Sequence, residues 1–405
     1  MMLIEFISRA FIVLLSLPAA YLFLSTVAAY FFRKECASEN RFLNIGVLIS
    51  AHNEEDGIGG TIGHVLASDY PANRFEVFVI ADNCTDHTAR NASAAGAKVF
   101  ERSDPVHRGK GQALDWFLKN RQDHYRHMDA IAIIDADVVP DKNFLRETSL
   151  SLSQPRIDVV QAYNGVSNFE AGWRPALIDA AFNVFNHLRM AGSAVLSGTC
   201  VLKGNGMAFR TSLLQSHGWP CHSIVEDMEF TLQLLDEGID VHYNPDASVR
   251  SEMVTSGKNA SSQRSRWESG RFMLVGSMGG ILLKKFIASG KPRYLYAFAE
   301  LAVPPLSLLV LLFSIATAGS FVLPDNVWLF PVIGFWVILV FYVFSGQVLR
   351  RAPLSTWLYL LTAPFYVAWK IPLYAGMMVK KRSTAWVRTT RESEKNDKNN
   401  TLHRH

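Results

Sequence analysis

Two kinds of hydrophobic pattern alternate along this chain. Long apolar runs without a charged residue lie at 11–32, 301–323 and 327–349. A run of about 20 apolar residues is long enough to cross the hydrocarbon core of a bilayer. Between 33 and 293 the apolar runs are short and end in polar residues. The pattern predicts an N-terminal transmembrane helix, a globular domain and a C-terminal α-helical membrane region.

The globular region alternates strand patterns with helix patterns. Short runs rich in Val, Ile and Ala predict strands, and Ala-rich or amphipathic stretches between them predict helices. We expect strands at 45–50, 75–81, 98–100 and 130–134, with helices at 61–67, 88–95 and 112–120. This alternation is typical of an α/β fold with a parallel sheet. Polar residues that follow the strands should therefore meet at one sheet edge, where such folds bind ligands.

Beyond residue 141 the order of elements changes. We expect a strand at 159–163, a long helix at 171–190, a loop into a strand at 204–210 and a helix at 225–237. The apolar stretch at 272–289 is interrupted by Lys284 and Lys285. That interruption favours a helix that lies in the membrane interface.

The strand that begins at Ala130 runs directly into two aspartates, Asp135 and Asp137. At the period of two of a β-strand, both side chains point the same way. Two hard oxygen ligands side by side suit Mg²⁺ or Mn²⁺ and, through the metal, a diphosphate. The alternative is an Asp-rich turn that only ends the strand.

Composition and charge support a membrane protein. Hydrophobic residues make up 49% of the chain, and the net charge of +4 is small. The cations gather beside the apolar runs, as at Arg33-Lys34 and Arg350-Arg351. This placement indicates cytoplasmic flanks and contact with membrane lipids, not a nucleic-acid surface. A cleaved signal peptide is the alternative for the first run, although that run is longer than the usual signal core.

Five features follow one another along the domain: Asn53-Glu54, Asp82 with Asp86, Asp135-x-Asp137, Glu226-Asp227 and Gln263-x-x-Arg266-Trp267. In this order they resemble the membrane-embedded branch of glycosyltransferase family 2, which includes cellulose, chitin and hyaluronan synthases and ceramide glucosyltransferase. The resemblance covers about 45–267. It implies a GT-A fold, the Rossmann-like domain of transferases that use nucleotide-diphospho-sugars.

The resemblance implies a donor site on the first half of the domain. Asn53 and Glu54 match the loop that helps to hold the nucleotide, although Ser50 and His52 replace the usual Pro and Tyr. Asp82 matches the contact to the base, and the second aspartate often found beside it is Ala81 here.

Lys110 matches a lysine near the nucleotide; the alternative is a solvated cation that precedes a helix. Asp135 and Asp137 match the residues that bind the diphosphate and a Mg²⁺ or Mn²⁺ ion, with Asp137 as the direct ligand. A divalent cation neutralises the negative charge that builds on the departing nucleoside diphosphate.

Asp227 matches the general base of the family. Inverting transfer needs a carboxylate that removes the proton of the acceptor hydroxyl. The alternative is an acidic residue that only stabilises the first turn of a helix. Glu226 is expected to be structural or to shape the acceptor site.

Gln263, Arg266 and Trp267 match the acceptor-side platform and diphosphate clamp of the family. Arginine can hold phosphate with two parallel hydrogen bonds, and tryptophan offers a flat apolar face to a sugar ring. The alternative is that Arg266 and Trp267 anchor a helix at the lipid headgroups.

The expected organisation is that of an integral protein of a bacterial cell membrane with its catalytic domain in the cytoplasm, where nucleotide sugars are found. The segment at 354–379 could span, but a re-entrant or interfacial hairpin agrees better with the basic residues that follow it. We expect an anchor at 1–34, a GT-A domain at 35–271, an interfacial amphipathic helix at 272–293, a membrane region at 294–382 with two transmembrane helices and a third or re-entrant segment, and a polar cytoplasmic tail at 383–405.

The expected function is inverting transfer of a sugar from a UDP- or GDP-sugar to a lipid-linked or other membrane-associated acceptor, in exopolysaccharide or glycolipid assembly. A processive polysaccharide synthase is the first alternative, but few membrane helices are available to form a secretion channel. An inactive nucleotide-binding scaffold is the second alternative, and the retained motifs argue against it.

Overall fold

The computed structural model describes residues 2–34, 41–223, 225–253 and 257–379, so the tail expected at 383–405 lies outside it. The chain divides into two compact units. The sheet unit contains Arg33–Asn168 and Gly198–Ala260, and the helical unit contains Met1–Phe32, Phe169–Ser197 and Ser261–Arg382.

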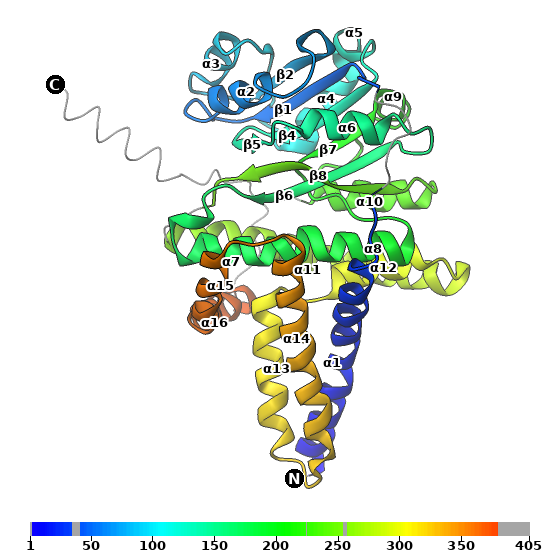
Figure 1. Cartoon of the computed structure of the whole chain (residues 1–405), viewed down its shortest axis with the longest axis vertical. Coiled ribbons are helices and arrows are strands. Elements are labelled where there is room, and N and C mark those ends of the chain that lie inside the picture. Colours follow the sequence, from blue (N-terminus) through cyan, green and yellow to red (C-terminus); the bar gives the residue numbers. More distant parts are fainter. Residues whose placement is uncertain (1, 35–40, 224, 254–256, 380–405) are drawn as a thin grey trace, which may run out of the picture. The chain divides into compact units, whose positions relative to one another are not determined.

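The sheet unit contains one eight-stranded mixed sheet with the order β3-β2-β1-β4-β7-β6-β8-β5 (Figure 1). β1 to β4 are parallel, β7 is antiparallel to both of its neighbours, and β5 is antiparallel to β8. The predicted α/β fold is confirmed. The strands are β1 (Ile45–Ala51), β2 (Phe75–Asp82), β3 (Lys98–Arg102), β4 (Ala130–Asp135), β5 (Val138–Pro140), β6 (Val159–Val166), β7 (Met207–Arg210) and β8 (Val241–Ser251).

Helices cover the sheet and complete its core. Ile49, Val79 and Ile134 of three adjacent strands are fully buried, together with Ile58 and Ile62 of the first covering helix. Burying such side chains contributes about 1.5–3 kcal/mol each. The helices of this unit are α2 (Ile58–Leu66), α3 (Thr88–Ala94), α4 (Lys110–Asn120), α5 (Gln122–Tyr125), α6 (Phe144–Leu152), α9 (Thr211–His217) and α10 (Glu226–Asp236).

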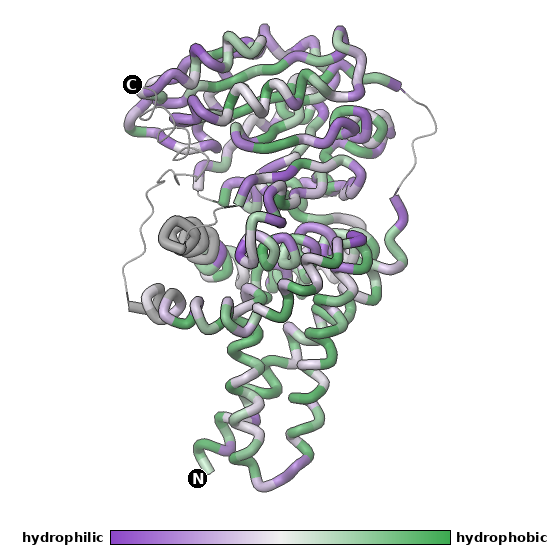
Figure 2. Tube along the Cα trace, turned by 60° about the vertical axis from the view of Figure 1, so that its left-hand side comes forward, coloured by the Kyte–Doolittle hydropathy of each residue, from purple (hydrophilic) through white to green (hydrophobic). Residues whose placement is uncertain are grey.

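The helical unit combines long helices with helices that cross their ends. In Figure 1, α1, α13 and α14 lie side by side, and α11 runs across one end of them; Figure 2 shows hydrophobic residues along the long helices. The helices are α1 (Met2–Ala29), α7 (Trp173–Phe182), the π-helix η3 (Asn183–Leu188), α8 (Arg189–Ser197), α11 (Gly257–Ser289), α12 (Pro292–Ala302), α13 (Leu306–Ser320), α14 (Leu329–Leu349), α15 (Leu354–Tyr359) and α16 (Ala363–Val379).

The segment Phe169–Ser197 belongs to the helical unit although the sequence places it inside the globular domain. Its single expected helix is α7 and α8 joined by the π-helix η3. Close glycine contacts explain the packing. A Cβ at Gly192 would overlap the carbonyl of Ser25 in α1, and a Cβ at Gly346 would overlap Val184. Small residues allow helices to approach this closely in membrane proteins.

Three described helices are long and apolar enough to cross a membrane: α1, the Gly270–Ser289 part of α11, and Asn326–Leu349. α12 and α13 meet this criterion only as a pair bent by 79°. The sequence predicts one run at 301–323, but Pro304 and Pro305 separate the two helices because proline cannot continue the backbone hydrogen bonds. Within the described part of 354–379, no helix meets the criterion.

Candidate active site

The carboxyl ends of β1, β2 and β4 lie at the same level of the sheet. Ser50 of β1 pairs with Ile80 of β2 on one side and with Asp135 of β4 on the other. The segments that follow carry Asn53-Glu54, Asp82 and Asp137. The expected gathering of polar residues at one sheet edge is therefore present in the structure.

Asn53 joins the loops that follow β1 and β2. Its Oδ1 accepts a hydrogen bond from the Thr85 amide at 2.8 Å, and its Nδ2 donates to Thr85 Oγ1 at 3.2 Å. The backbone amide of Glu54 donates to Thr88 Oγ1 at 2.8 Å. Asn53 adopts a left-handed conformation with φ of 55°, which asparagine tolerates better than most residues. These bonds fix the shape of the predicted nucleotide loop.

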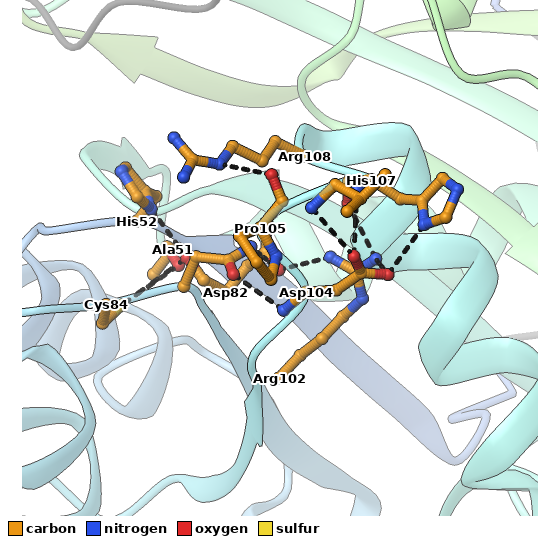
Figure 3. Close-up of polar contacts among 11 residues, drawn as sticks. Ala51, His52, Asp82, Cys84, Arg102, Asp104, Pro105, His107 and Arg108 are labelled. Carbon is orange, nitrogen blue, oxygen red and sulfur yellow. Dashed lines mark hydrogen bonds and ion pairs between the residues drawn. The ribbon is translucent and has the colours of Figure 1, made fainter.

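Asp82 forms a buried ion pair with Arg102 (Figure 3). Arg102 Nη1 lies 2.6 Å from Asp82 Oδ1, and only 5% and 6% of the two side chains are exposed. Arg102 Nη2 also donates to Asp104 and to the carbonyl of His107. The ring of His52 lies 2.7 Å from the backbone carbonyl of Asp82. Asp82 thus anchors the edge of the site through Arg102, and its contact to a base stays a prediction.

Lys110 is the first residue of α4 and reaches across to β4. Its ammonium lies 2.5 Å from Asp135 Oδ1 and donates to the carbonyl of Gly204. Burial disfavours its charged form, but Asp135, Glu226 and Asp227 outweigh burial and raise the pKa of the Lys110 ammonium. Lys110 is therefore not a solvated surface cation. We refer to Lys110, Asp135, Glu226 and Asp227 as the Lys110 cluster.

The Asp135 side of the cluster is open. Its side chain is 41% exposed, and its backbone amide donates to Asn205 Oδ1 at 3.2 Å. β4 ends at Asp135, and Asp137 lies in the turn before β5. The expectation that a strand orients both aspartates alike therefore does not hold for Asp137, because the backbone turns after Asp135.

Asp135 and Asp137 fit a divalent ion that is also coordinated by a bound ligand. Among the described residues, no group of three or more His, Cys, Asp or Glu side chains could hold an ion alone. Asp135 and Asp137 supply hard carboxylate oxygens at a partly exposed edge. Mg²⁺ is commonly bound through one or two carboxylates together with phosphate oxygens of a substrate. The resemblance assigns the direct contact with the ion to Asp137, and that assignment stays a prediction; the ammonium of Lys110 contacts Asp135.

Glu226 and Asp227 open α10 on the other side of Lys110. The Asp227 carboxylate accepts a hydrogen bond from the Met228 amide at 2.8 Å. Burial raises the pKa of Asp227 against the opposing effect of Lys110. Burial and the charge of Asp227 raise the pKa of Glu226 to about 8. Burial thus moves the pKa of Asp227 in the direction that suits a general base at neutral pH.

The Gly204-Asn205-Gly206 loop holds the two sides of the site together. Gly204 has φ of +74°, and a Cβ there would lie 3.2 Å from Asp227 Oδ2. The buried side chain of Asn205 accepts from the Asp135 amide and donates to Ser251 Oγ at 3.3 Å. The loop therefore brings a backbone carbonyl to Lys110 and leaves room for Asp227.

Gln263, Arg266 and Trp267 lie on α11, but their side chains are outside the described part of the structure. Their acceptor-side role stays a prediction. Sequence reasoning missed Arg102 and the hydrogen bond of Asn205 to Asp135. Arg102 pairs in register with Asp82 on the neighbouring strand, so only the strand alignment could have revealed it.

The mixed sheet and the acidic edge define a transferase domain of the GT-A type. Residues 43–270 match the family described as glycosyltransferase like family 2. The chain belongs to glycosyltransferase family 2.

Curated relatives are similar over the same region. Beta-monoglucosyldiacylglycerol synthase of a Nostoc species is 26% identical over 256 residues, 61% of this chain and 53% of that protein. Glucomannan 4-beta-mannosyltransferase 7 of Arabidopsis thaliana is 27% identical over 278 residues, 65% of this chain and 49% of that protein. The chain spans about half the length of these relatives.

One solved structure is similar over nearly the whole chain. A mannosyltransferase from Pyrobaculum calidifontis, in complex with GDP-Man and Mn²⁺, aligns with a TM-score of 0.58 and 16% identity over 94% of this chain and 100% of that one. At this identity the likeness shows the fold.

Proposed function

We propose that this protein is an inverting, metal-dependent glycosyltransferase that transfers a hexose from a UDP-sugar to a lipid-linked acceptor in a membrane. The observation that carries the proposal is the Lys110 cluster, where one ammonium is surrounded by Asp135, Glu226 and Asp227 at the carboxyl edge of the sheet. This arrangement combines groups that could bind a diphosphate, directly or through a metal ion, with a carboxylate that could take the proton of an acceptor hydroxyl.

In the proposed reaction, Asp227 accepts the proton of the acceptor hydroxyl as that oxygen forms a bond to the anomeric carbon. The bond between the anomeric carbon and the phosphate oxygen breaks, and its electron pair leaves with the nucleoside diphosphate. Lys110 stabilises negative charge beside Asp135. A Mg²⁺ or Mn²⁺ ion held by Asp137 and Asp135 would supply further positive charge to the leaving diphosphate.

Glu226 supports this reaction without touching the acceptor. It is buried beside Asp227, and its raised pKa favours a protonated form that adds no repulsion to the neighbouring carboxylate. Asn53, Glu54 and Asp82 shape the donor loop, and Gln263, Arg266 and Trp267 are assigned to the acceptor and diphosphate side on the family pattern alone.

A lipid-linked acceptor is supported by the candidate membrane helices and by relatives named as glycolipid synthases. Relatives named as glucomannan mannosyltransferases favour a second candidate, a processive polysaccharide synthase. The number of sugars in the product separates the two candidates, because single transfer adds one sugar to each acceptor.

The decisive experiment compares Asp227→Asn with the unmodified protein in lipid, with a panel of nucleotide sugars and Mn²⁺. We expect unchanged donor binding and a fall in transfer of about 10²- to 10⁴-fold, the usual contribution of a general base. Glu229→Gln, in the first turn of the same helix, is the matched control and should transfer normally.

Normal transfer by the Asp227 variant would show that Asp227 is not the base and only stabilises the first turn of its helix. If the unmodified protein consumed no donor even with membrane extract as acceptor, the scaffold alternative would replace the enzyme.

A further inference from the structure

A cluster of aromatic rings around one arginine lies in the helical unit, between α7 and α16. The ring centroids of Trp173 and Tyr366 are 6.2 Å apart at 85°, and those of Tyr366 and Trp369 are 5.6 Å apart. The guanidinium carbon of Arg174 lies 4.3 Å from the Trp173 ring and 5.7 Å from the Trp369 ring. We refer to Trp173, Arg174, Tyr366 and Trp369 as the Arg174 cluster.

Arg174 is stabilised by rings, but no acceptor for its N–H groups lies in the part of the chain that the structure describes. Within the described residues its guanidinium makes no hydrogen bond and no ion pair, and its Nε is buried without a partner. Two more deeply buried arginines differ, because each has a carboxylate partner: Arg102 contacts Asp82 and Asp104, and Arg189 contacts Glu300. Burying a polar group without a hydrogen-bond partner is unfavourable.

The geometry of the stacking leaves the donors available to a ligand. A ring covers a face of the planar guanidinium, whereas its N–H bonds lie in the plane and point outward. Trp173 and Trp369 each carry an indole N–H, and Tyr366 carries a hydroxyl. Lys370, which is 3% exposed, adds a second positive charge 5.6 Å from the Tyr366 ring. The cluster therefore offers several donors and one positive charge, and the Lys370 ammonium adds a second positive charge beside it.

The cluster lies near the end of a candidate membrane helix. Two hydrogen bonds join α7 and the π-helix η3 that follows it to the last turn of α14. Gln347 Nε2 donates to the carbonyl of Ala180 in α7 at 3.0 Å, and Asn183 Nδ2 of η3 donates to Gln347 Oε1 at 2.8 Å. Arg350 and Arg351 follow that helix. The end of a spanning helix meets the lipid headgroups, where Trp, Tyr and basic residues are enriched.

We propose that the Arg174 cluster binds the phosphate group of an anionic membrane lipid. Arginine binds phosphate through two parallel charge-assisted hydrogen bonds, which would satisfy the guanidinium that the described protein leaves without an acceptor. The surrounding rings hold the guanidinium in one orientation and exclude water from its faces. This inference does not depend on the catalytic assignments, and its test measures binding.

The experiment measures binding of a fluorescent phosphatidylglycerol to the purified full-length protein in uncharged detergent micelles. Arg174→Gln should weaken saturable binding about tenfold or more, since a hydrogen bond to a charged group is worth about 1.5–3 kcal/mol. Lys284→Gln removes the same charge from an exposed position on α11 and should leave binding unchanged.

Two further variants keep the proposal testable if Arg174→Gln fails to fold. Arg174→Lys keeps the charge but loses the planar fork, and Trp369→Leu keeps Arg174 but removes one ring; both should weaken binding. Phosphatidylcholine, whose headgroup is neutral overall, should compete poorly, and so should inorganic phosphate.

Equal losses in Arg174→Gln and Lys284→Gln would overturn the proposal, because they would indicate general surface charge. Competition by inorganic phosphate as strong as that by phosphatidylglycerol would assign the site to a soluble anion instead of a lipid. Binding that does not saturate would also overturn it.

Discussion

Each unit of this protein contains a buried cation beside carboxylates, and the two differ in how completely they are closed. In the helical unit, Arg189 and Glu300 are 1% and 8% exposed, and Glu300 Oε2 also accepts from the Tyr21 hydroxyl at 2.8 Å. In the sheet unit, Lys110 and Asp135 are 20% and 41% exposed. The first pair is closed off inside the protein, whereas the second is partly exposed at the sheet edge.

The two ion pairs also differ in the numbers of acidic and basic groups around them. Glu300 faces Arg189, and its backbone carbonyl also accepts from Arg271, so the basic groups outnumber the acids there. Lys110 faces three carboxylates, of which Glu226 has a pKa raised to about 8. A buried excess of carboxylate is stabilised by protons or by a divalent cation. The comparison separates a charge pair that is closed inside the protein from one that is proposed to bind a ligand and react.

The largest effect should come from Asp137→Asn. Loss of this proposed metal ligand should lower metal-dependent transfer about 10³-fold, because a bound cation contributes several kcal/mol of charge stabilisation. The unfolding temperature should stay close to that of the unmodified protein, since Asp137 is partly exposed. Transfer assays over a Mn²⁺ series and thermal unfolding in detergent measure the two quantities.

Asp123→Asn, at an exposed position on α5, is the control for a lost aspartate. Full activity of Asp137→Asn without added metal would remove the ion from the proposal.

The opposite result is expected from Glu300→Gln. Removing one partner of a buried ion pair costs about 3–5 kcal/mol, because Arg189 stays buried without a counter-charge. Glu76→Gln, which breaks the exposed ion pair with Lys98, should cost only about 0–1 kcal/mol. Unfolding temperatures of the two variants provide the comparison. Equal temperatures would show that the closed pair contributes no more than a surface pair.

The smallest effect is a shift in pH dependence. A base acts only when ionised, so transfer should be lost as the pH falls through the raised pKa of Asp227, above the usual value of about 3.9. Lys110 lowers this pKa, so Lys110→Met should move the acidic limb of the kcat profile to higher pH. Lys119→Met, on the same helix and 66% exposed, should leave the limb in place. A limb that stays fixed in Lys110→Met would show that another group titrates.

The same shifts have a consequence for stability. The pKa of Glu226 is higher in the folded chain than in the unfolded one, so the folded state binds the proton more tightly. Its contribution to stability is complete below the unfolded pKa and is lost as the pH rises through about 8. A divalent ion at the proposed site would oppose this loss, so added Mn²⁺ should raise the unfolding temperature most at high pH.

The strands, and the polar residues at their carboxyl ends, could be predicted from the sequence because both depend on local patterns. The expected strands at 45–50 and 75–81 are β1 (Ile45–Ala51) and β2 (Phe75–Asp82), since continuous apolar runs are buried on both faces of a parallel sheet. Asp82 and Asp135 were placed correctly at the ends of such runs.

Features that depend on distant partners could not be predicted. The alignment of β2 with β3 decides that Asp82 meets Arg102, and no local pattern specifies that alignment. The antiparallel strand β7 and the contact of Asn205 with Asp135 likewise join segments far apart in the sequence. Pro304 is a local signal for the break between α12 and α13, but the continuous apolar run around it favours one helix instead.

The partners of the π-helix η3 are synthesised at very different times. Its neighbour α1 is made before it, but Gly346 and Gln347, which contact Val184 and bond Asn183, are made more than 150 residues later. The strands β1 to β6 are complete by Val166, long before that partner exists. During synthesis on the ribosome, the packing around η3 therefore stays incomplete until α14 is made. The Asn183 amide lacks its bond to Gln347 until then.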